Sequence, residues 1–316
     1  PDLISFDMGG TTAKMCLIEG ARAQRTHEFE AGRVRRFKKG SGIPLKVSVV
    51  DMIEIGAGGG SIAALDSMGL LKVGPRSAGS EPGPVAYQRG GQLPTVTDAD
   101  LLLGCLDPNY FLGGEMNLAT QSVSEVVGRQ LAVPMGMSTL EAAQGIHSVV
   151  NENMAAATRR YLAEKGKDPR RYTMIAFGGA GPVHAYGLAK LLKIRRLIVP
   201  FGAGVTSALG FLVAPPAVDQ VRSLVMRLDG IDWDTVNGLF DDMEAEAASR
   251  LTEVGAKPAE IVFERLADMR HVGQGFEIQV PVPFGVLNQS DHGELSSNFF
   301  DTYQQLFERR VNDVPV

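Results

Sequence analysis

The chain has 316 residues, 44% of them hydrophobic and 21% charged, with a formal net charge of −5. These values are typical of a globular protein with one or two domains, and the acidic balance argues against nucleic acid or an anionic membrane as a partner. The only cysteines are Cys16 and Cys105, so neither a disulfide framework nor a CxxC zinc motif is expected, and no apolar stretch is long enough for a membrane span, which together predict a cytoplasmic protein.

The first predicted elements are two strands joined by a glycine turn. Apolar runs predict strands over 3–6 and 13–18, with Asp7-Met-Gly-Gly-Thr-Thr12 between them. The polar stretch 22–30 extends this meander, and the basic run 33–39 (RVRRFKK) is interpreted as a solvated loop. The remaining predicted features of this half are a β-branched strand over 47–55, a glycine-rich turn over 56–61, and an ordered functional insertion over 69–108 in which Gly and Pro are frequent.

The second half of the chain begins with a strong helix signal. Ser138-Thr-Leu-Glu141 is a capping box, and apolar residues follow at spacings of three and four until Gly166. A strand over 172–177 then leads into Gly178-Gly-Ala-Gly-Pro182, which opens a helix over 184–192. The remaining predicted elements are a strand over 196–199, helices over 202–212, 233–254 and 293–310, and a hairpin of 261–269 with 276–282.

The first glycine turn has the composition of a phosphate site. Consecutive backbone N–H groups in a turn can form an anion nest, and the hydroxyls of Thr11 and Thr12, the charge of Lys14 and a Mg²⁺ held by Asp7 would complete it. An ordinary hairpin explains the same residues equally well. The turn at Gly178 strengthens the phosphate interpretation, because it follows a buried strand and places a helix N-terminus at a ligand.

These two turns, in this order, resemble the second lobe of the actin-like ATPase fold. The long segment from Gly56 to Met116, together with AFGGAGPVHA (176–185) and ADMRHVGQ (267–274), looks like the hydantoinase A / 5-oxoprolinase family, and FDMGGTTAK looks like its N-methylhydantoinase A branch. The resemblance covers nearly the whole chain. It departs from the family pattern at Pro84–Gly91, where we expect Pro-Ala-Cys-Tyr-Gly-Arg-Gly-Gly, and at His271, where a tyrosine is usual.

The resemblance implies an α/β, actin-like (ribonuclease H-like) lobe with a family-specific insertion. It also implies ATP and Mg²⁺ as cofactors and hydrolysis of a cyclic amide, of the hydantoin or 5-oxoproline type, by phosphorylation of the amide oxygen. A second subunit like hydantoinase B, an oligomeric assembly and an N-terminal lobe with its own phosphate hairpin are expected as partners. The chain is then an internal piece of a larger subunit, inactive alone. A ketone carboxylase subunit and a non-catalytic actin-like nucleotide-binding module are the alternatives.

The domain division expected from these signals has four parts. Residues 1–62 form the phosphate-hairpin meander, 63–137 the insertion with substrate-side loops, 138–220 the rest of the lobe with the nucleotide turn, and 221–316 a C-terminal α+β segment.

Candidate site residues follow from the same reasoning. The expected catalytic residues are Asp7, Lys14, Asp98, Asp268 and Arg270, the expected substrate-side residues are Ser77, Glu81, His184 and His271, and the expected nucleotide-binding residues are Gly9, Gly10, Thr11, Thr12, Gly58, Gly59, Gly178, Gly179 and Gly181.

Several of these residues have a structural alternative. Gly58 to Gly60 fit tight packing on the hairpin as well as ligand contact, and His184 fits a structural role. Asp98 and Asp100 fit helix capping or a role as base or metal ligand, with capping favoured for Asp98. Asp268, Arg270 and His271 are expected to form a buried ion-pair network or a site. His27, His147 and His292 are interpreted as structural or surface residues.

Overall fold

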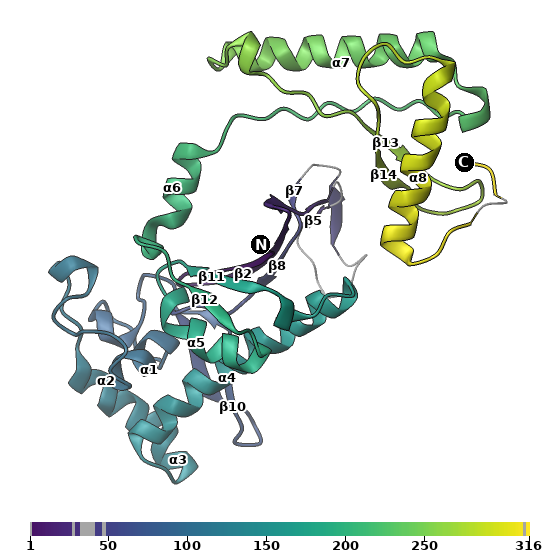
Figure 1. Ribbon diagram of the computed structural model, residues 1–316. Helices are drawn as coiled ribbons and strands as arrows, with labels where there is room; N and C mark the ends of the chain where they lie inside the picture. Colours follow the sequence, from purple (N-terminus) through teal and green to yellow (C-terminus); the bar gives the residue numbers. More distant parts are fainter. Residues whose placement is uncertain (1, 27–28, 32–41, 46–48, 312–313) are drawn as a thin grey trace. The chain divides into compact units, whose positions relative to one another are not determined.

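The structure is a computed structural model that describes residues 2–26, 29–31, 42–45, 49–311 and 314–316 (Figure 1). The chain forms two compact units, residues 1–213 and 214–316. The finer four-part division stays a prediction, and the basic run 33–39 lies outside the described residues. None of the described helices is long and apolar enough to cross a membrane.

A mixed sheet forms the centre of the first unit. Its strand order is β12-β11-β1-β2-β3, with β8 also paired to β2. β1 is antiparallel to β2 and parallel to β11, which is in turn parallel to β12. The strands expected at 3–6, 13–18, 172–177 and 196–199 are therefore confirmed, and one sheet unites them. The strand bounds are β1 Leu3–Met8, β2 Ala13–Glu19, β3 Arg22–Ala23, β8 Met52–Ile55, β11 Thr173–Phe177 and β12 Arg196–Ile198.

Two helices, α4 (Thr139–Glu164) and α5 (Gly181–Leu192), cover one face of this sheet (Figure 1). Along β1 the burial alternates, so that Ile4, Phe6 and Met8 enter the core while the residues between them are only half-buried. The hydroxyl of Thr158 in α4 lies 2.6 Å from the sulfur of Met15, the residue opposite Phe6, which fixes this face as the covered one. Asp7 alternates with these core residues and lies on the opposite face.

The capping box at Ser138 is confirmed. The Ser138 hydroxyl accepts the N–H of Glu141 at 3.3 Å, and the Glu141 carboxylate accepts the N–H of Ser138 at 2.8 Å. Two of the otherwise unpaired donors at the helix N-terminus are thereby satisfied.

The insertion is ordered and contains more regular structure than its sequence suggested. A hairpin of β9 (Ser61–Leu65) and β10 (Leu71–Ser77) leads to α1 (Val96–Leu102) and α2 (Thr120–Val127). The hairpin was missed because Gly74-Pro75 interrupts the strand pattern, and the register shifts between Val73 and Ser77. The short helix α3 (Val133–Met135) ends this region, and the strands β4 (Arg25–Thr26), β5 (Phe29–Ala31), β6 (Ile43–Leu45) and β7 (Val49–Val50) form two small ribbons before it.

After β12 a short 3₁₀ turn leads into α6 (Thr206–Val213), so the helix expected from 202 begins four residues later. Large apolar side chains here are exposed, among them Phe201, Phe211 and Leu212.

The second unit contains α7 (Trp233–Glu253), β13 (Leu266–Met269), β14 (Ile278–Pro281) and α8 (His292–Phe307). Its core comprises Val280, Leu287, Leu295, Phe299 and Tyr303 with their neighbours. The strand expected over 261–269 begins only at Leu266.

The charged cluster expected to be buried in this unit is largely exposed. Asp268 is exposed because β13 pairs only with β14 and one side of this two-stranded sheet is open. Arg270, just after β13, is exposed as well, and of the three residues only His271 is buried. The buried charge is Arg265 instead, whose guanidinium donates to Glu244 at 2.6 Å and to the Gly285 carbonyl at 2.7 Å.

A polar network joins the end of β2 to the segment before β11. The carboxylate of Glu19 accepts from Lys167 at 2.8 Å, from the Tyr172 hydroxyl at 2.6 Å and from Gln24 at 2.9 Å. Partial burial acts to raise the pKa of Glu19, but these hydrogen bonds outweigh it, so the pKa lies below its ordinary value.

We expect Glu19→Gln to reduce the free energy of unfolding by about 1 kcal/mol at neutral pH. Because the folded-state pKa of Glu19 is depressed, its contribution is present above the unfolded-state pKa and is lost as the pH falls through the lower, folded-state value. Urea unfolding should therefore show a constant gap between wild type and variant down to about pH 5 and a shrinking one below about pH 4. The exposed Glu152→Gln serves as the control, and an equal loss there would contradict the assignment.

Candidate functional site

The turn between β1 and β2 presents unpaired backbone donors. The N–H of Gly9 donates to the carbonyl of Thr12 at 3.1 Å and closes the turn. Within the described part of the chain, the N–H groups of Gly10 and Thr11 have no protein acceptor, and both residues are exposed. The turn therefore has the free donors that an anion nest requires.

The second glycine segment, Gly56–Ser61, packs directly on this turn. The N–H groups of Gly59 and Gly60 donate to the carbonyls of Gly9 and Gly10 at 3.0 and 2.7 Å. A Cβ atom on Gly58 would lie 2.5 Å from both the carbonyl carbon of Gly10 and the amide nitrogen of Thr11. Tight packing of this segment on the hairpin is thus what the contacts show, and the ligand role expected for Gly58 and Gly59 stays a prediction.

The third glycine segment follows β11 and reaches the same turn. Gly178 has φ +88°, and a Cβ atom there would collide with the Asp7 carboxylate and lie 2.5 Å from the Met8 carbonyl oxygen. The N–H of Ala180 donates to that Met8 carbonyl at 2.9 Å. Since α5 starts at Gly181, its N-terminus, where the helix dipole is positive, lies beside the hairpin.

Asp7 stands where these segments converge. It is the cross-strand partner of Lys14 and lies beside Phe177 of β11, just before Gly178. The hydroxyl of Ser207 in α6 donates to its Oδ2 at 3.3 Å. Sequence reasoning missed Ser207, because nothing local in GAGVTSALG marks a residue 200 positions from its partner.

The structure thus brings together most of the residues expected to bind ATP, including Asp7, Lys14, the hairpin 9–12 and the Gly178 turn. Ser77 belongs to the same neighbourhood: its Oγ would lie 2.8 Å from a Cβ atom on Gly60. Glu81 is exposed in the loop that follows β10, and its role as a substrate contact stays a prediction.

Both carboxylate oxygens of Asp98 accept hydrogen bonds from neighbouring residues. Its buried carboxylate accepts the N–H groups of Val85, Ala86 and Thr95 and the hydroxyl of Thr95, at 2.8–3.2 Å. Thr95 is the N-cap of α1 and Asp98 its N3 residue, so the two form a capping box. Burial raises the pKa of Asp98 above its ordinary value although these hydrogen bonds act in the opposite direction. These bonds occupy both carboxylate oxygens of Asp98, which favours the capping role over the role as a base.

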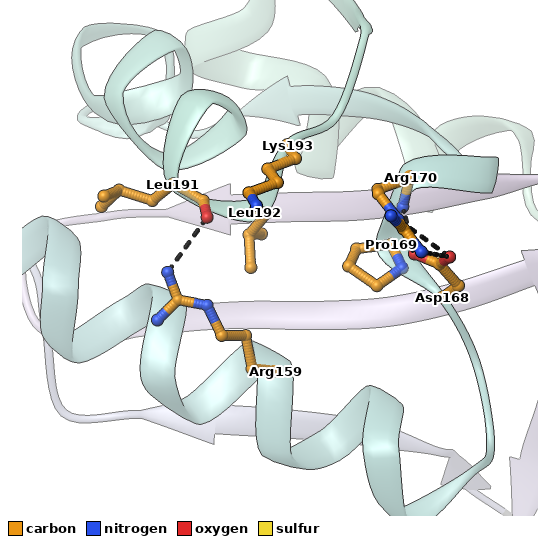
Figure 2. Close-up of a pocket in the computed structure, with 7 residues that line it drawn as sticks. All are labelled: Arg159, Asp168, Pro169, Arg170, Leu191, Leu192 and Lys193. Atoms are coloured by element: carbon orange, nitrogen blue, oxygen red, sulfur yellow. Dashed lines mark hydrogen bonds and ion pairs between the residues drawn. The ribbon is translucent and has the colours of Figure 1, made fainter.

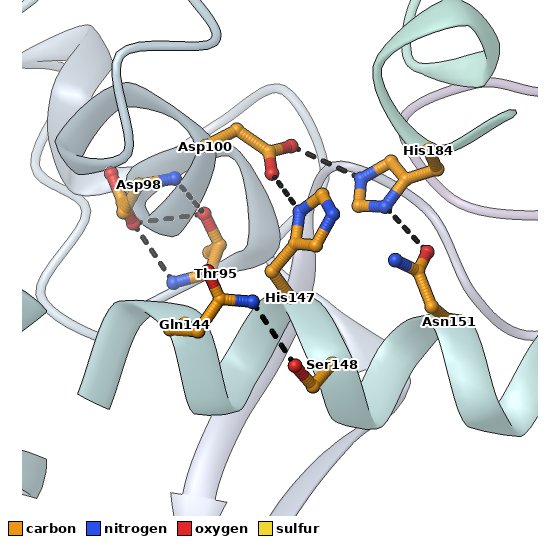
Figure 3. A network of polar contacts seen from close by, with 8 residues as sticks. All are labelled: Thr95, Asp98, Asp100, Gln144, His147, Ser148, Asn151 and His184. Atoms are coloured by element: carbon orange, nitrogen blue, oxygen red, sulfur yellow. Dashed lines mark hydrogen bonds and ion pairs between the residues drawn. The ribbon is translucent and has the colours of Figure 1, made fainter. Parts of the chain in front are cut away.

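His184 and Asp100 meet in a buried cluster that the sequence did not predict (Figure 3). His184 Nε2 lies 3.1 Å from one oxygen of Asp100, and His147 Nδ1 lies 2.9 Å from the other. Burial would raise the pKa of Asp100, but hydrogen bonds with His147 and His184 outweigh it and lower the pKa. His147 was interpreted as a structural or surface residue, and the sequence did not reveal its partner, Asp100. A signal was available in the i, i+4 spacing of His147 and Asn151, which places both side chains on one face of α4.

Asp268, Arg270 and His271 belong to the second unit, and their expected roles stay predictions. Arg270 donates to the carbonyl of Gln274 at 2.8 Å and lies 3.6 Å from Glu277, which accounts for its charge. His271 Nδ1 lies 3.0 Å from the Val314 carbonyl oxygen, so it donates there, and its buried Nε2 has no hydrogen-bond partner in the described part of the chain.

A pocket of about 220 Å³ in the first unit lies away from the glycine turns (Figure 2). It is lined by Leu191 and Leu192 at the C-terminal end of α5, whereas the Gly178 turn is at the N-terminal end; twelve helical residues span about 18 Å. Its polar groups are paired internally: Arg159 donates to the Leu191 carbonyl at 3.0 Å, and Arg170 holds the pKa of Asp168 to about 2. We therefore do not assign the catalytic site to this pocket.

Comparison with known proteins gives concordant matches. The family model described as Hydantoinase/oxoprolinase matches residues 1–220. The chain is 34% identical over 318 residues to the caprolactamase subunit alpha of Pseudomonas jessenii, covering 100% of this chain and 44% of that subunit. It is 38% identical over 281 residues to the acetophenone carboxylase gamma subunit of Aromatoleum aromaticum, covering 86% of this chain and 37% of that subunit.

Solved structures agree with these relatives. A nucleotide-free acetone carboxylase, studied for ATP-dependent acetone carboxylation, matches with a TM-score of 0.78 and 25% identity, over 99% of this chain and 45% of that one. The ATP-dependent caprolactamase from Pseudomonas jessenii matches with a TM-score of 0.74 and 33% identity, over 100% of this chain and 45% of that one. The chain therefore spans less than half the length of these relatives.

Proposed function

Because the chain belongs to the hydantoinase/oxoprolinase family, we propose that it forms part of an ATP-dependent enzyme that opens a cyclic amide. In this proposal the amide oxygen is phosphorylated, which converts a ring that resists water into a far better electrophile. ATP supplies the phosphoryl group, and the residues of this chain bind and orient it.

The observation that carries the proposal is the convergence of three glycine segments on Asp7. Gly178 and Gly58 lie where any Cβ atom would strike the hairpin, while Gly10 and Thr11 keep free N–H donors. Such a cradle suits the phosphates of a nucleotide, since backbone donors can approach closely only where side chains are missing. An actin-like ATPase lobe, the fold we propose, has phosphate hairpins of this kind.

Each residue has a proposed task. Gly9, Gly10, Thr11 and Thr12 bind phosphate, with the Lys14 ammonium neutralising charge nearby. Asp7 holds Mg²⁺, and Gly178, Gly179 and Gly181 line the nucleotide. Phosphoryl transfer depends mainly on positioning and charge neutralisation, which these groups supply.

A second candidate is a ketone carboxylase subunit that phosphorylates its substrate with ATP. The specific support is the 38% identity to the acetophenone carboxylase gamma subunit and the TM-score of 0.78 with acetone carboxylase. The glycine cradle suits both reactions, because both use ATP. A non-catalytic nucleotide-binding module is less well supported, since the ordered insertion from β9 to α3 exceeds what binding alone requires.

We also propose that the site is completed by groups outside this chain. The names of the relatives identify them as subunits, and the chain spans 44% of the caprolactamase subunit. The exposed apolar side chains of Phe201, Phe211 and Leu212 near Ser207 are suited to contact with another part of a longer subunit or a partner.

The test is ATP turnover by the complete subunit with its partner. We expect phosphate release to be stimulated by a cyclic amide, and Asp7→Asn to reduce that release by about 100-fold or more because a Mg²⁺ ligand is lost. Asp242→Asn, an exposed change of the same kind in α7, should have no effect. Stimulation by ketones with bicarbonate instead would favour the carboxylase, and full turnover by Asp7→Asn would contradict the hairpin assignment.

A further inference from the structure

Three side chains from three helices converge in the core of the first unit. Asp100 comes from α1, His147 from α4 and His184 from α5 (Figure 3). One ligand-type atom from each lies within 4.8 Å of the others. Asp100 and His184 have side chains only 4% and 0% exposed, whereas the His147 side chain is 15% exposed. The cluster is therefore buried but reachable from the His147 side.

Hydrogen bonding fixes the orientation of His184. Its Nδ1 lies 2.9 Å from Asn151 Oδ1, so this nitrogen carries the proton and donates it. A neutral His184 then presents the lone pair of Nε2 to a carboxylate oxygen 3.1 Å away. Two lone pairs at that distance repel unless a proton or a cation lies between them.

A divalent cation can take the place of the proton between His184 and Asp100. The imidazole rings of His147 and His184 are stacked, with centroids 4.5 Å apart and planes at 19°, so two imidazolium rings would repel each other. In the described part of the chain, the cationic partners of Asp100 are these two histidines alone, without a lysine or arginine. A buried carboxylate needs compensating positive charge, which either one imidazolium ring or a divalent ion supplies, and metal binding distinguishes the two.

We propose that Asp100, His147 and His184 bind a divalent transition-metal ion, with Zn²⁺ as the best-suited ion. Two imidazole nitrogens and one carboxylate oxygen form a common ligand set for Zn²⁺, with a fourth position left for water. Ligand atoms around a tetrahedral Zn²⁺ lie about 3.3–3.5 Å apart, and the three ligand atoms here lie within 4.8 Å of one another, so small shifts of the side chains bring them to that spacing. Asn151 orients His184, as second-layer partners of metal-bound histidines do.

This site is separate from the proposed Mg²⁺ position at Asp7. It connects helices that contact the glycine turns. The N–H of Thr97, in α1, donates to the Gly59 carbonyl at 2.7 Å, and His184 lies one helical turn after Gly181. An ion joining α1, α4 and α5 therefore holds together helices that support two of the three glycine segments. The inference rests on the geometry of this cluster and does not depend on the ATP chemistry.

The experiment is metal binding by the full chain after removal of metal with a chelator. We expect one equivalent of Zn²⁺ to bind and to raise the midpoint of thermal unfolding. His147→Ala should weaken Zn²⁺ binding by at least about 100-fold, since even second-layer partners are worth 10–100-fold. His292→Ala, which removes a histidine from the second unit, should bind as the wild type does.

A second variant keeps the test decisive if His147→Ala folds poorly. His147→Cys supplies a thiolate ligand, so its Co²⁺ form should show a thiolate-to-cobalt absorption band that the wild type does not have. Lack of stoichiometric metal in the wild type would overturn the proposal in favour of a proton-bonded cluster. Wild-type affinity in His147→Ala, or no such band in His147→Cys, would overturn it equally.

Discussion

Replacing Gly58 by alanine should destabilise the first unit by about 3 kcal/mol and reduce ATP turnover by at least about 100-fold. The new Cβ atom would lie 2.5 Å from backbone atoms of Gly10 and Thr11, which cannot move aside as a flexible side chain can. To relieve the collision, the segment must separate from the hairpin. Separation breaks the hydrogen bonds from Gly59 and Gly60 to the hairpin carbonyls and displaces the N–H groups proposed to bind phosphate.

Matched glycine variants control for the loss of backbone freedom. Gly10→Ala and Gly179→Ala add a Cβ atom with no other atom within 4 Å of it, and neither glycine has a left-handed φ. Their free energies of unfolding should stay within about 0.5 kcal/mol of the wild type, measured by urea unfolding. If Gly58→Ala were as stable as Gly10→Ala, the packing of the glycine segment on the hairpin would be wrong.

Features encoded over a few neighbouring residues were predictable. The alternation of Ile4, Phe6 and Met8 indicates a strand with one covered face, and Ser138 with Glu141 forms a complete capping box within four residues. Both signals depend on local geometry alone. β10 was missed for the same reason, because Gly74-Pro75 breaks the local pattern and only pairing with β9 identifies the strand.

The candidate site likewise has parts that were predictable from neighbouring residues and parts that were not. The glycine turns could be recognised from their composition, and their convergence was expected from the resemblance to a known fold. The contacts between Asp100, His147 and His184 join residues 47 and 84 positions apart, and no local period encodes them. For Asp268 the alternating pattern was correct for a strand, but whether a face of a strand is buried depends on which elements pack against it.

A variant of Asp98 distinguishes a structural role of this residue from a catalytic one. We expect Asp98→Asn to reduce the free energy of unfolding by about 3 kcal/mol. The side chains have the same shape, but an amide NH₂ replaces one carboxylate oxygen and cannot accept. Whichever way the amide is turned, at least one buried donor among Val85, Ala86 and Thr95 loses its acceptor and faces another donor.

Urea unfolding together with turnover separates the two roles. Asp107→Asn is the matched control, because the Asp107 carboxylate also accepts a backbone N–H, that of Asn109 at 2.8 Å, but in an exposed turn where water replaces the lost acceptor. It should cost less than about 1 kcal/mol. For Asp98→Asn, turnover per folded molecule at low temperature should stay within about threefold of the wild type, since general acid–base catalysis is worth 10²–10⁴-fold and none would be lost. A hundredfold fall in turnover with unchanged unfolding would instead make Asp98 a catalytic base and its capping bonds secondary.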